Sequence, residues 1–213
     1  MNLMPISLFT ADNLRQRVAA RLDTPDDDND YGDHRWNPGH PRLDLITSIK
    51  FRAAAVLIPI VDRPEGATVI LTQRTETLRH HSGQVAFPGG QVDETDGTPE
   101  FTALREADEE IGLRPDLVEI IARMPDYRSG SGYRISPVIG IVQPGFEFDA
   151  NPDEVSDVFE TPLAFLMDPA NHARASREFN SVEWAYYEMP HDGHRIWGVT
   201  AGILRSMYER YYA

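Results

Sequence analysis

The sequence predicts an α/β protein in which a mixed β-sheet lies between helices. Apolar runs of strand length and amphipathic stretches of helical length follow one another along the chain, but in no regular order. Strict alternation is typical of a parallel sheet, so the irregular order favours strands that run in both directions. With 213 residues, of which 41% are hydrophobic, the chain is long enough for one ordinary core.

The N-terminal part differs in composition from the rest of the chain. Residues 10–22 carry aliphatic side chains at the spacing of one helical face, which predicts a short amphipathic helix. Residues 23–41 are rich in Asp, Pro and Gly and are expected to form a loop. We therefore predict that residues 1–45 are an appended helix and acidic loop, and that residues 46–213 form the main domain.

The first strands of the main domain are expected shortly after residue 50. The continuous apolar run at 53–61 has the length of a buried strand, and 68–74 has the composition of a second strand. The turn sequence at 63–66 between them predicts a β-hairpin. Residues 79–97, which surround the sequence FPGG, are expected to be a loop.

A helix is expected at 99–111 because the sequence carries signals for both of its ends. Thr98 can cap the first turn, Pro99 suits the first helical position, and Gly112 can end the helix. The remaining patterns predict strands at 117–124, 135–143 and 182–189, a loop at 126–134, mixed strand and turn signals at 154–163, and a strand followed by an amphipathic helix at 194–212.

Acidic side chains are concentrated in the expected helix at 99–111. Glu106, Glu109 and Glu110 have i, i+3 and i+4 spacing, which places three carboxylates on one side of the helix. The opposite side is expected to be apolar and consists of Phe101, Leu104, Ala107 and Ile111. Such a cluster can be a solvated helix face, or it can bind a divalent cation such as magnesium, which prefers oxygen ligands.

Two features beside the cluster favour cation binding. Gly89 and Gly90 precede the helix, and glycine lets the backbone approach a ligand or metal closely, although these glycines alone would indicate only a tight turn. Arg105 can orient the carboxylates through paired hydrogen bonds.

The charge balance excludes some classes of function. Acidic residues outnumber Lys and Arg by 34 to 20, which gives a formal net charge of −14. Such a field repels phosphate, so we expect no nucleic-acid binding, and an anionic ligand would need metal ions between it and the acids. The chain has no cysteine, no apolar run of membrane-spanning length and no recognisable signal peptide, so we expect a cytoplasmic protein without membrane contact. The sequence does not define the oligomeric state, and a homodimer is one possibility.

Residues 90–113 resemble the signature of the Nudix hydrolases: a glycine, a loop, and then R-E-x-x-E-E-x-G. The positions that match are Arg105, Glu106, Glu109, Glu110 and Gly112. This sequence departs from the family pattern in the loop, which is one residue longer and has Asp96 where the family has glutamate. The resemblance implies a Nudix-type α/β/α sandwich with a mixed sheet.

Residues 70–90 are similar to the element that marks the coenzyme A pyrophosphatases within this family. The matching positions are Ile70, Leu71, Thr72, Arg74, Thr75, Arg79, Gly83 and Phe87 to Gly90, with conservative replacements at 70 and 75. Residues 131–140 and 195–204 resemble later parts of the same branch, and residues 1–45 show no resemblance to it. The branch implies hydrolysis of the diphosphate linkage of coenzyme A to 4′-phosphopantetheine and adenosine 3′,5′-bisphosphate.

The resemblance also implies roles for individual side chains. Glu106 and Glu110 are expected to bind Mg²⁺ or Mn²⁺, with Glu109 as a further ligand or as the catalytic base. Glu154, in a later loop, is an alternative base. Arg105 is expected to act in catalysis by orienting the carboxylates.

Substrate contacts are expected from residues that precede the acidic helix in sequence, between positions 74 and 90. Arg74 and Arg79 are candidates for phosphate contacts, or they form structural ion pairs. His81 can contact the substrate or fix the loop by a hydrogen bond. Gly89 and Gly90 can bring their backbone close to the ligand, and the carbonyl of Gly90 is a further candidate metal ligand.

Other readings remain open at the level of the sequence. Another coenzyme A derivative, ADP-ribose or a dinucleoside polyphosphate could be the substrate, because pocket shape decides between them. A non-catalytic Nudix binding module is disfavoured, because a degenerate member should have lost glutamates and this set is complete. Tyr127 and Tyr133 could stack on adenine, but packing is the favoured role for aromatic residues in such a loop.

Overall fold

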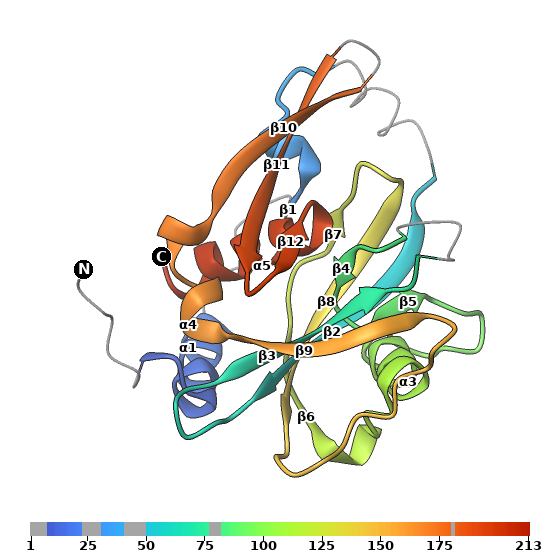
Figure 1. Cartoon of the computed structure of the whole chain (residues 1–213), viewed down its shortest axis with the longest axis vertical. Coiled ribbons are helices and arrows are strands. Elements are labelled where there is room, and N and C mark those ends of the chain that lie inside the picture. Colours follow the sequence, from blue (N-terminus) through green and yellow to red (C-terminus); the bar gives the residue numbers. More distant parts are fainter. Residues whose placement is uncertain (1–7, 23–30, 41–49, 77–81, 180–181) are drawn as a thin grey trace.

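The computed structural model describes residues 8–22, 31–40, 50–76, 82–179 and 182–213 (Figure 1). Nine strands of this described part form the main sheet: β1 (Tyr31–Gly32), β2 (Arg52–Val61), β3 (Thr68–Arg74), β4 (Val85–Ala86), β5 (Gly89–Gln91), β6 (Val118–Arg123), β7 (Tyr127–Arg128), β8 (Tyr133–Val142) and β9 (Val155–Pro162). Three more form a second sheet: β10 (Ala173–Phe179), β11 (Val182–His191) and β12 (His194–Trp197). The helices are α1 (Ala11–Leu22), α3 (Pro99–Ile111), α4 (Leu163–Leu166) and α5 (Val199–Tyr211), with short 3-10 turns η2 (Asp33–Trp36), η3 (Pro115–Leu117) and η4 (Pro169–Asn171).

Strand β2 organises the main sheet. It pairs in parallel with β8 along its whole length, from Arg52 opposite Tyr133 to Val61 opposite Val142. It also pairs antiparallel with β5 and, at its end, with β3. Because both directions occur in one sheet, the predicted mixed sheet and the predicted hairpin are confirmed.

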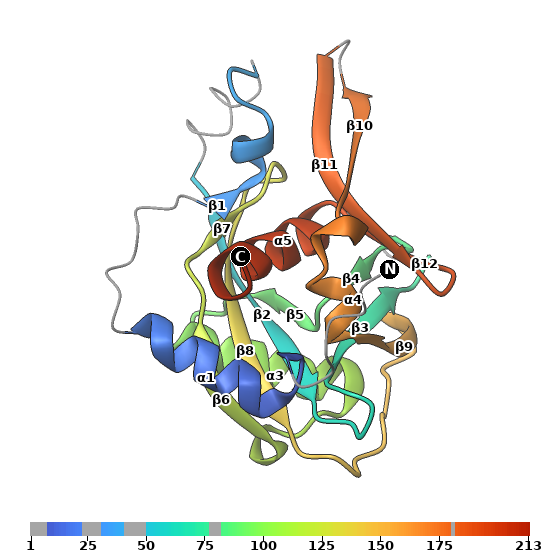
Figure 2. The same cartoon turned by 90° about the vertical axis from the view of Figure 1, so that its left-hand side faces the viewer.

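Helices cover both faces of the main sheet, as the resemblance implied. Ala55 and Leu57 of β2 point to the face that α3 covers. Ala54 and Ile58, of opposite parity, belong to the core on the other face. Helices α1 and α5 cover that second face, and Figure 2 shows them on the side of the sheet away from α3. Two apolar layers on one sheet therefore give the α/β/α sandwich.

The second sheet stands beside the main sheet and carries α5. Strand β12 leads through Gly198 directly into α5, and in Figure 1 the β10–β11 hairpin extends upward from this junction. The hydroxyl of Thr200 in α5 donates a hydrogen bond to the carbonyl of Val85 in β4 at 3.0 Å. This bond ties the end of the second sheet to the edge of the main sheet.

Several segments expected to be loops contain short strands. The predicted loop at 79–97 includes β4 and β5, the one at 126–134 includes β7, and the one at 23–41 includes β1 and η2. The segment with mixed signals at 154–163 is β9, and β10 was not predicted. Strands of two or three residues are too short to show an alternating pattern, so only their partners in the sheet define them.

The described N-terminal residues share the main core. Leu14 and Val18 of α1 are buried, and they belong to the hydrophobic cluster between α5 and the face of the sheet that α5 covers. The carboxylate of Asp33 accepts hydrogen bonds from the Tyr127 hydroxyl and the Gly130 amide, both at 2.6 Å. These contacts fasten the segment before β2 to the loop before β8, and the boundary near residue 45 stays a prediction.

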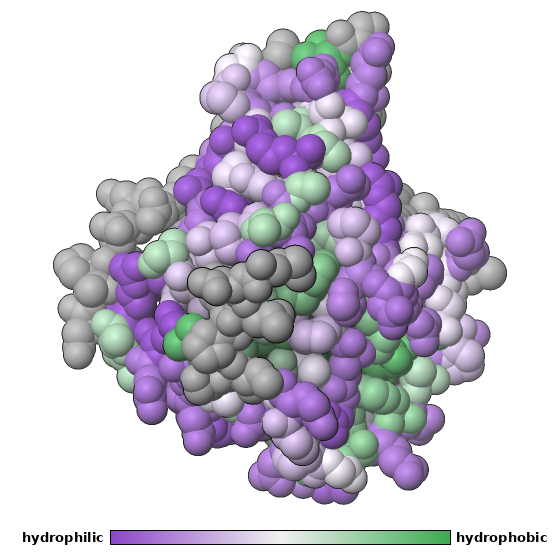
Figure 3. All heavy atoms as spheres, turned by 60° about the vertical axis from the view of Figure 1, so that its left-hand side comes forward, coloured by the Kyte–Doolittle hydropathy of each residue, from purple (hydrophilic) through white to green (hydrophobic). Residues whose placement is uncertain are grey.

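The surface of the described residues is mainly hydrophilic on the face that Figure 3 shows. Hydrophilic residues cover most of the face in Figure 3, and apolar residues occur there only in small groups. Within the described ranges, no helix is both long and apolar enough to cross a membrane.

Candidate metal and substrate site

Helix α3 presents its glutamates differently from the predicted arrangement. Glu110 is 2% exposed and lies on the buried side of the helix with Ala107 and Ile111. Phe101, which we expected on the apolar face, is 54% exposed. Both expectations were wrong because the helix wheel assumes one wet and one dry side. Helix α3 instead packs against both β2 and β5, so the buried side is rotated towards Glu110.

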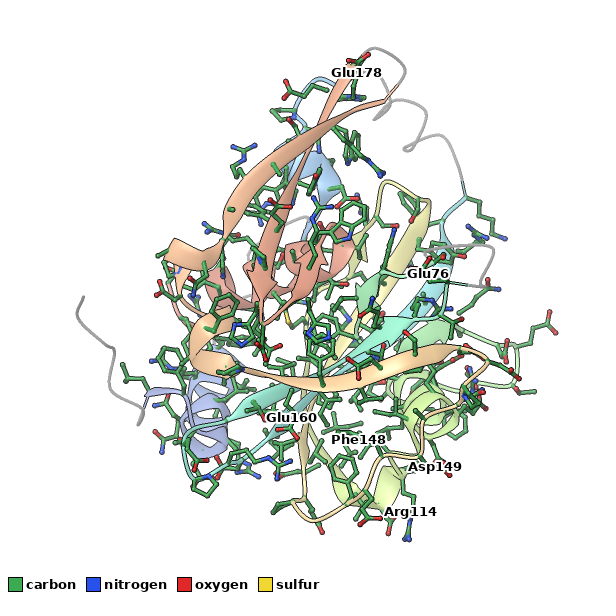
Figure 4. All side chains as sticks on the ribbon, in the orientation of Figure 1. Glu76, Arg114, Phe148, Asp149, Glu160 and Glu178 are labelled. Atoms are coloured by element: carbon green, nitrogen blue, oxygen red, sulfur yellow. The ribbon has the colours of Figure 1, made fainter. Side chains whose placement is uncertain are left out.

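The ends of α3 follow the predicted signals. The Thr98 hydroxyl accepts a hydrogen bond from the Phe101 amide at 3.2 Å, and Gly112 ends the helix in the left-handed conformation, with φ of 68°. Beyond it, the amide of Asp149 donates to the carbonyl of Ile111 at 3.0 Å, and Figure 4 shows Asp149 beside this end of α3. The start and end of the helix are therefore fixed, which also fixes the positions of its glutamates.

Arg105 connects α3 to the loop before it. Its guanidinium donates two hydrogen bonds to the carboxylate of Asp96, at 3.1 and 2.9 Å, and one each to Glu106 and Glu109 at 2.9 Å. The hydrogen bonds from Arg105 hold the pKa of Asp96 at about 2. Asp96 thus links the loop to α3, although it is one methylene shorter than glutamate. The predicted orienting role of Arg105 agrees with this geometry.

The two glycines of β5 lie directly against the glutamates. A Cβ atom added to Gly90 would lie 2.5 Å from the carboxyl carbon of Glu106. The amide of Gly89 donates a hydrogen bond to Glu110 at 3.3 Å. The β5 backbone therefore forms one wall of the carboxylate cluster, and only glycine at position 90 leaves room for Glu106 where it stands.

Glu110 is the most buried carboxylate of the cluster. Its second partner is Arg74, whose guanidinium lies 3.3 Å from it. Burial, with a smaller contribution from the charges of Glu106 and Glu154, raises the pKa of Glu110 to about 7, although Arg74 and the Gly89 amide oppose the shift. Arg74 and the Gly89 amide thus stabilise the charged form of Glu110 by less than burial destabilises it.

The pKa of Glu110 makes the stability of the metal-free protein depend on pH. Folding raises this pKa from 4.5 to about 7, so the folded state binds more protons between these values, and stability falls as the pH rises through this window. The loss is at most roughly 3 kcal/mol. Urea unfolding in a chelator at about pH 5 and about pH 8 measures it. In the Glu110→Gln variant the difference should be much smaller, and an unchanged difference would contradict the assignment.

Glu106 and Glu154 complete the cluster. Burial raises the pKa of Glu106 despite its contact with Arg105, and the charge of Glu154 contributes to the increase. The Glu154 carbonyl accepts a hydrogen bond from the Thr75 amide at 2.9 Å, which fixes this residue beside the end of β3. Three acidic residues from α3 and the loop before β9 therefore influence one another electrostatically.

The donor set suits a hard divalent cation, although the side chains are not arranged around one. Among the described residues, no three His, Asp or Glu side chains are placed so as to enclose a metal ion. Arg105 contacts Glu106, and Arg74 contacts Glu110, so these oxygen atoms would have to exchange partners on metal binding. Two observations fit a cation at this place. The charge of the buried Glu110 is only partly stabilised by its protein partners, and Gly90 has no side chain that would fill the space at the Glu106 carboxylate.

A cavity of about 290 Å³ begins at the same glycines and extends away from α3. Gly89, Gly90 and Arg74 line its inner end, next to the glutamates. Its walls are mainly apolar and include Ala54, Val56, Phe87, Ile135, Val199 and Ile203. Tyr133 and Trp197 line it as well. The carboxylate cluster and an apolar pocket are therefore joined through β5. A mainly apolar pocket with a few polar groups at one end is the usual composition of a small-molecule site.

Most of the predicted site residues come together here. Glu106, Glu109, Glu110, Arg105, Gly89, Gly90, Arg74 and Glu154 all belong to the cluster or to the adjoining end of the pocket. Arg79 and His81 lie outside the described residues. Tyr127 is buried and bonded to Asp33, so it packs, whereas Tyr133 lines the pocket. The pocket residues Phe87, Trp197 and Ile203 were not predicted individually, and the only signal for them was the similarity of the segments that contain them.

Comparisons with known proteins agree with this site. Residues 51–196 match the model of the NUDIX domain. The chain is 44% identical over 172 residues to the Nudix hydrolase NudL of Escherichia coli K12, described as uncharacterized, covering 78% of this chain and 86% of that protein. It is 45% identical over 172 residues, with the same coverage, to NudL of Shigella boydii serotype 4.

A solved structure supports the fold. The Nudix hydrolase RenU from M. smegmatis matches with a TM-score of 0.51 at 20% identity, and the match covers 74% of this chain and 84% of that one. The glutamate cluster on α3, the domain match and the NudL relatives all indicate the same class of enzyme. The chain therefore belongs to the Nudix family and is a Nudix hydrolase of nucleoside diphosphate derivatives.

Proposed function

We propose that the protein hydrolyses the diphosphate linkage of coenzyme A, or of a close derivative, to 4′-phosphopantetheine and adenosine 3′,5′-bisphosphate. The observation that carries the proposal is the continuity between the glutamates and the apolar pocket through Arg74, Gly89 and Gly90. A diphosphate at β5 would place one of its two substituents in that pocket. The similarity of residues 70–90 to the coenzyme A pyrophosphatases supports coenzyme A as the source of this substituent.

Glu106 and Glu110 are the residues that would hold the divalent cation, which we propose to be Mg²⁺ or Mn²⁺, with Glu109 as a further ligand. Such a cation, when bound, neutralises diphosphate charge and makes water a better nucleophile. Arg105 keeps the carboxylates in place, since its Nη2 and Nη1 donate to Glu106 and Glu109, while its Nε and Nη2 donate to Asp96. The chain thus supplies carboxylates held in place by Arg105, and the cation that they would hold would offset their repulsion of an anionic substrate.

The base that accepts the proton of the attacking water is either Glu109 or Glu154. Glu109 is exposed, and Arg105 bonds to its carboxylate at 2.9 Å. Glu154 is half-buried and close enough for its charge to affect both Glu106 and Glu110. We propose Glu154, because its carboxylate has no hydrogen bond or ion pair among the residues the structure describes and can accept a proton without first leaving an arginine.

Replacement of Arg74 tests the substrate side of the site. In the Arg74→Ala variant we expect KM to rise roughly tenfold, because the guanidinium that lines the pocket beside the diphosphate is lost. Steady-state kinetics with coenzyme A measures this change. Arg63→Ala is the matched control, because Arg63 is paired with Glu160 and does not line the pocket. An unchanged KM in Arg74→Ala would contradict substrate contact.

Product analysis tests the proposed function itself. The protein is incubated with Mg²⁺ and coenzyme A, and separately with ADP-ribose and a dinucleoside polyphosphate, and the products are identified by mass spectrometry. The proposal predicts 4′-phosphopantetheine and adenosine 3′,5′-bisphosphate, with the highest kcat/KM for coenzyme A or an acyl derivative. Turnover of ADP-ribose without turnover of coenzyme A would overturn it, and binding without any turnover would indicate a non-catalytic module. We also propose that the protein acts in the cytoplasm, and a homodimer remains compatible with this function.

A further inference from the structure

Arg52 is the first residue of β2 and comes two residues before Ala54, which lines the apolar pocket. The start of β2 and its neighbour Tyr133 are called the rim of the pocket below. It lies directly opposite Tyr133 in the parallel register of β2 and β8. Its guanidinium stacks over the Tyr133 ring, 4.0 Å from the ring centroid. Tyr133 in turn lines the pocket. The ring therefore holds the guanidinium in a fixed place at the pocket, although Arg52 is exposed.

Among the described residues, no carboxylate pairs with the guanidinium of Arg52. Acidic residues are abundant in this chain, and many arginines meet one: Arg15, Arg35, Arg63, Arg74, Arg105, Arg114, Arg123, Arg134, Arg195 and Arg205. Within the described part of the chain, the Arg52 side chain has the ring contact and no hydrogen bond or ion pair. Lys50, the only lysine of the sequence, is exposed two residues earlier. A positive charge thus remains available at this rim.

The register of the sheet gives the distance of Arg52 from the diphosphate end. Ala55 of β2 pairs with Gly90, the glycine against Glu106. Arg52 precedes Ala55 by three residues, which is about 10 Å along a strand. Arg52 also has the parity of Ala54 and Val56, both of which line the pocket. A long arginine side chain on this face can therefore approach a group one sugar ring away from a diphosphate at Gly90.

We propose that Arg52, held on Tyr133, binds a phosphate monoester of the substrate that is separate from the diphosphate being cut. The guanidinium is planar and suits a phosphate through two parallel hydrogen bonds. The inference rests on the proposed function, in which this group is the 3′-phosphate on the ribose of coenzyme A. Arg52 would then be a specificity residue that favours nucleotides with this phosphate over those without it.

A second arginine defines the alternative outcome. Arg177 of β10 lies over the Trp197 ring, 5.5 Å from its centroid, and lines a smaller cavity of about 100 Å³ that shares Trp197 with the pocket. No strand register relates Arg177 to Gly90, whereas Arg52 belongs to a strand that pairs with it. The two arginines can be distinguished by separate substitution.

The test compares Arg52→Gln, Arg52→Lys, Arg177→Gln and Arg134→Gln with the unmodified protein. Arg134→Gln is the matched control, because Arg134 follows Tyr133, points to the other face of β8 and is paired with Asp126. Binding of adenosine 3′,5′-bisphosphate and of adenosine 5′-monophosphate is measured by calorimetry with Mg²⁺ present. Hydrolysis of coenzyme A and of 3′-dephospho-coenzyme A is measured by product formation.

We expect Arg52→Gln to weaken binding of the bisphosphate roughly tenfold and to raise KM for coenzyme A to a similar extent. The monophosphate and the dephospho substrate should change by less than about twofold, Arg52→Lys should restore part of the loss, and Arg134→Gln should have no effect. Three results would overturn the inference. Arg52→Gln could weaken binding of the ligands with and without the 3′-phosphate equally, it could have no effect, or the loss could be confined to Arg177→Gln. If neither coenzyme A substrate is hydrolysed but Arg52 still discriminates the two nucleotides, the proposed function fails and the phosphate subsite stands.

Discussion

The Glu110→Gln variant should lose at least roughly a thousandfold in kcat while it keeps its fold. Glutamine has nearly the same shape, so the contacts of this buried side chain with the Gly89 amide can be retained. What it lacks is the negative charge that a divalent cation needs. Outer-sphere residues of metal sites typically contribute roughly 10–100-fold, and a direct ligand should contribute more.

The control for this variant lies on the same helix. Asp108→Asn removes one charge from α3, but Asp108 is exposed and faces away from the cluster, so its kcat should stay within about twofold of the parent. Circular dichroism and thermal unfolding in a chelator should show both variants folded. A Glu110→Gln protein that keeps most of its activity would contradict the role assigned to this residue.

Alanine at the two neighbouring glycines should have opposite consequences. A Cβ on Gly90 meets the carboxylate of Glu106, a flexible group that can move away. We therefore expect Gly90→Ala to keep its Tm within about 3 °C but to lose roughly a hundredfold in kcat/KM, because Glu106 is displaced. The measurement is kcat/KM in parallel with a thermal melt.

Gly89→Ala is the contrasting variant. Its added Cβ would overlap the carbonyl oxygen of Ala55 and lie 2.7 Å from the Cα of Val56, and the residue has a φ of 156°. These neighbours are backbone atoms of β2 and cannot move without disturbing the sheet, so Tm should fall by roughly 5–10 °C. If Gly90→Ala were instead the unstable variant and Gly89→Ala the inactive one, the placement of β5 against Glu106 would be wrong.

The parts of this site that could be predicted from the sequence are those defined by local spacing. Thr98, Gly112 and the spacing of the glutamates are all internal to one helix, so the limits of α3 and the identity of its acidic residues follow from the chain alone. The parallel pairing of β2 with β8 could not be predicted in this way, because more than seventy residues separate the two strands in sequence. Contacts of this kind depend on the register of the sheet, which no local pattern encodes.

The burial of Glu110 shows most clearly where sequence reasoning failed. A wheel projection uses spacing alone, and it placed Glu106, Glu109 and Glu110 together on the side opposite Ala107 and Ile111. The structure separates them into one buried, one half-buried and one exposed carboxylate. Packing of α3 against β2 and β5 buries Glu110, and this burial raises its pKa although Arg74 and the Gly89 amide lower it.

The Arg105–Asp96 contact is a second case in which structure adds to the sequence. A longer loop with a shorter acid would be expected to weaken the link between loop and helix. The two hydrogen bonds from Arg105, with a third from the Thr102 hydroxyl at 2.9 Å, show that the link is preserved. The link therefore forms with a longer loop and a shorter acid, which a pattern of fixed spacing does not predict.

The proposed reaction depends on binding of a divalent cation by the glutamates of α3 at the inner end of the pocket. Titration of the metal-free protein with Mn²⁺, followed by electron paramagnetic resonance, tests this claim without reference to any substrate. The parent and Asp108→Asn should bind Mn²⁺ with equal affinity, whereas Glu110→Gln should bind at least roughly tenfold more weakly. Equal Mn²⁺ affinity in all three proteins would contradict the account.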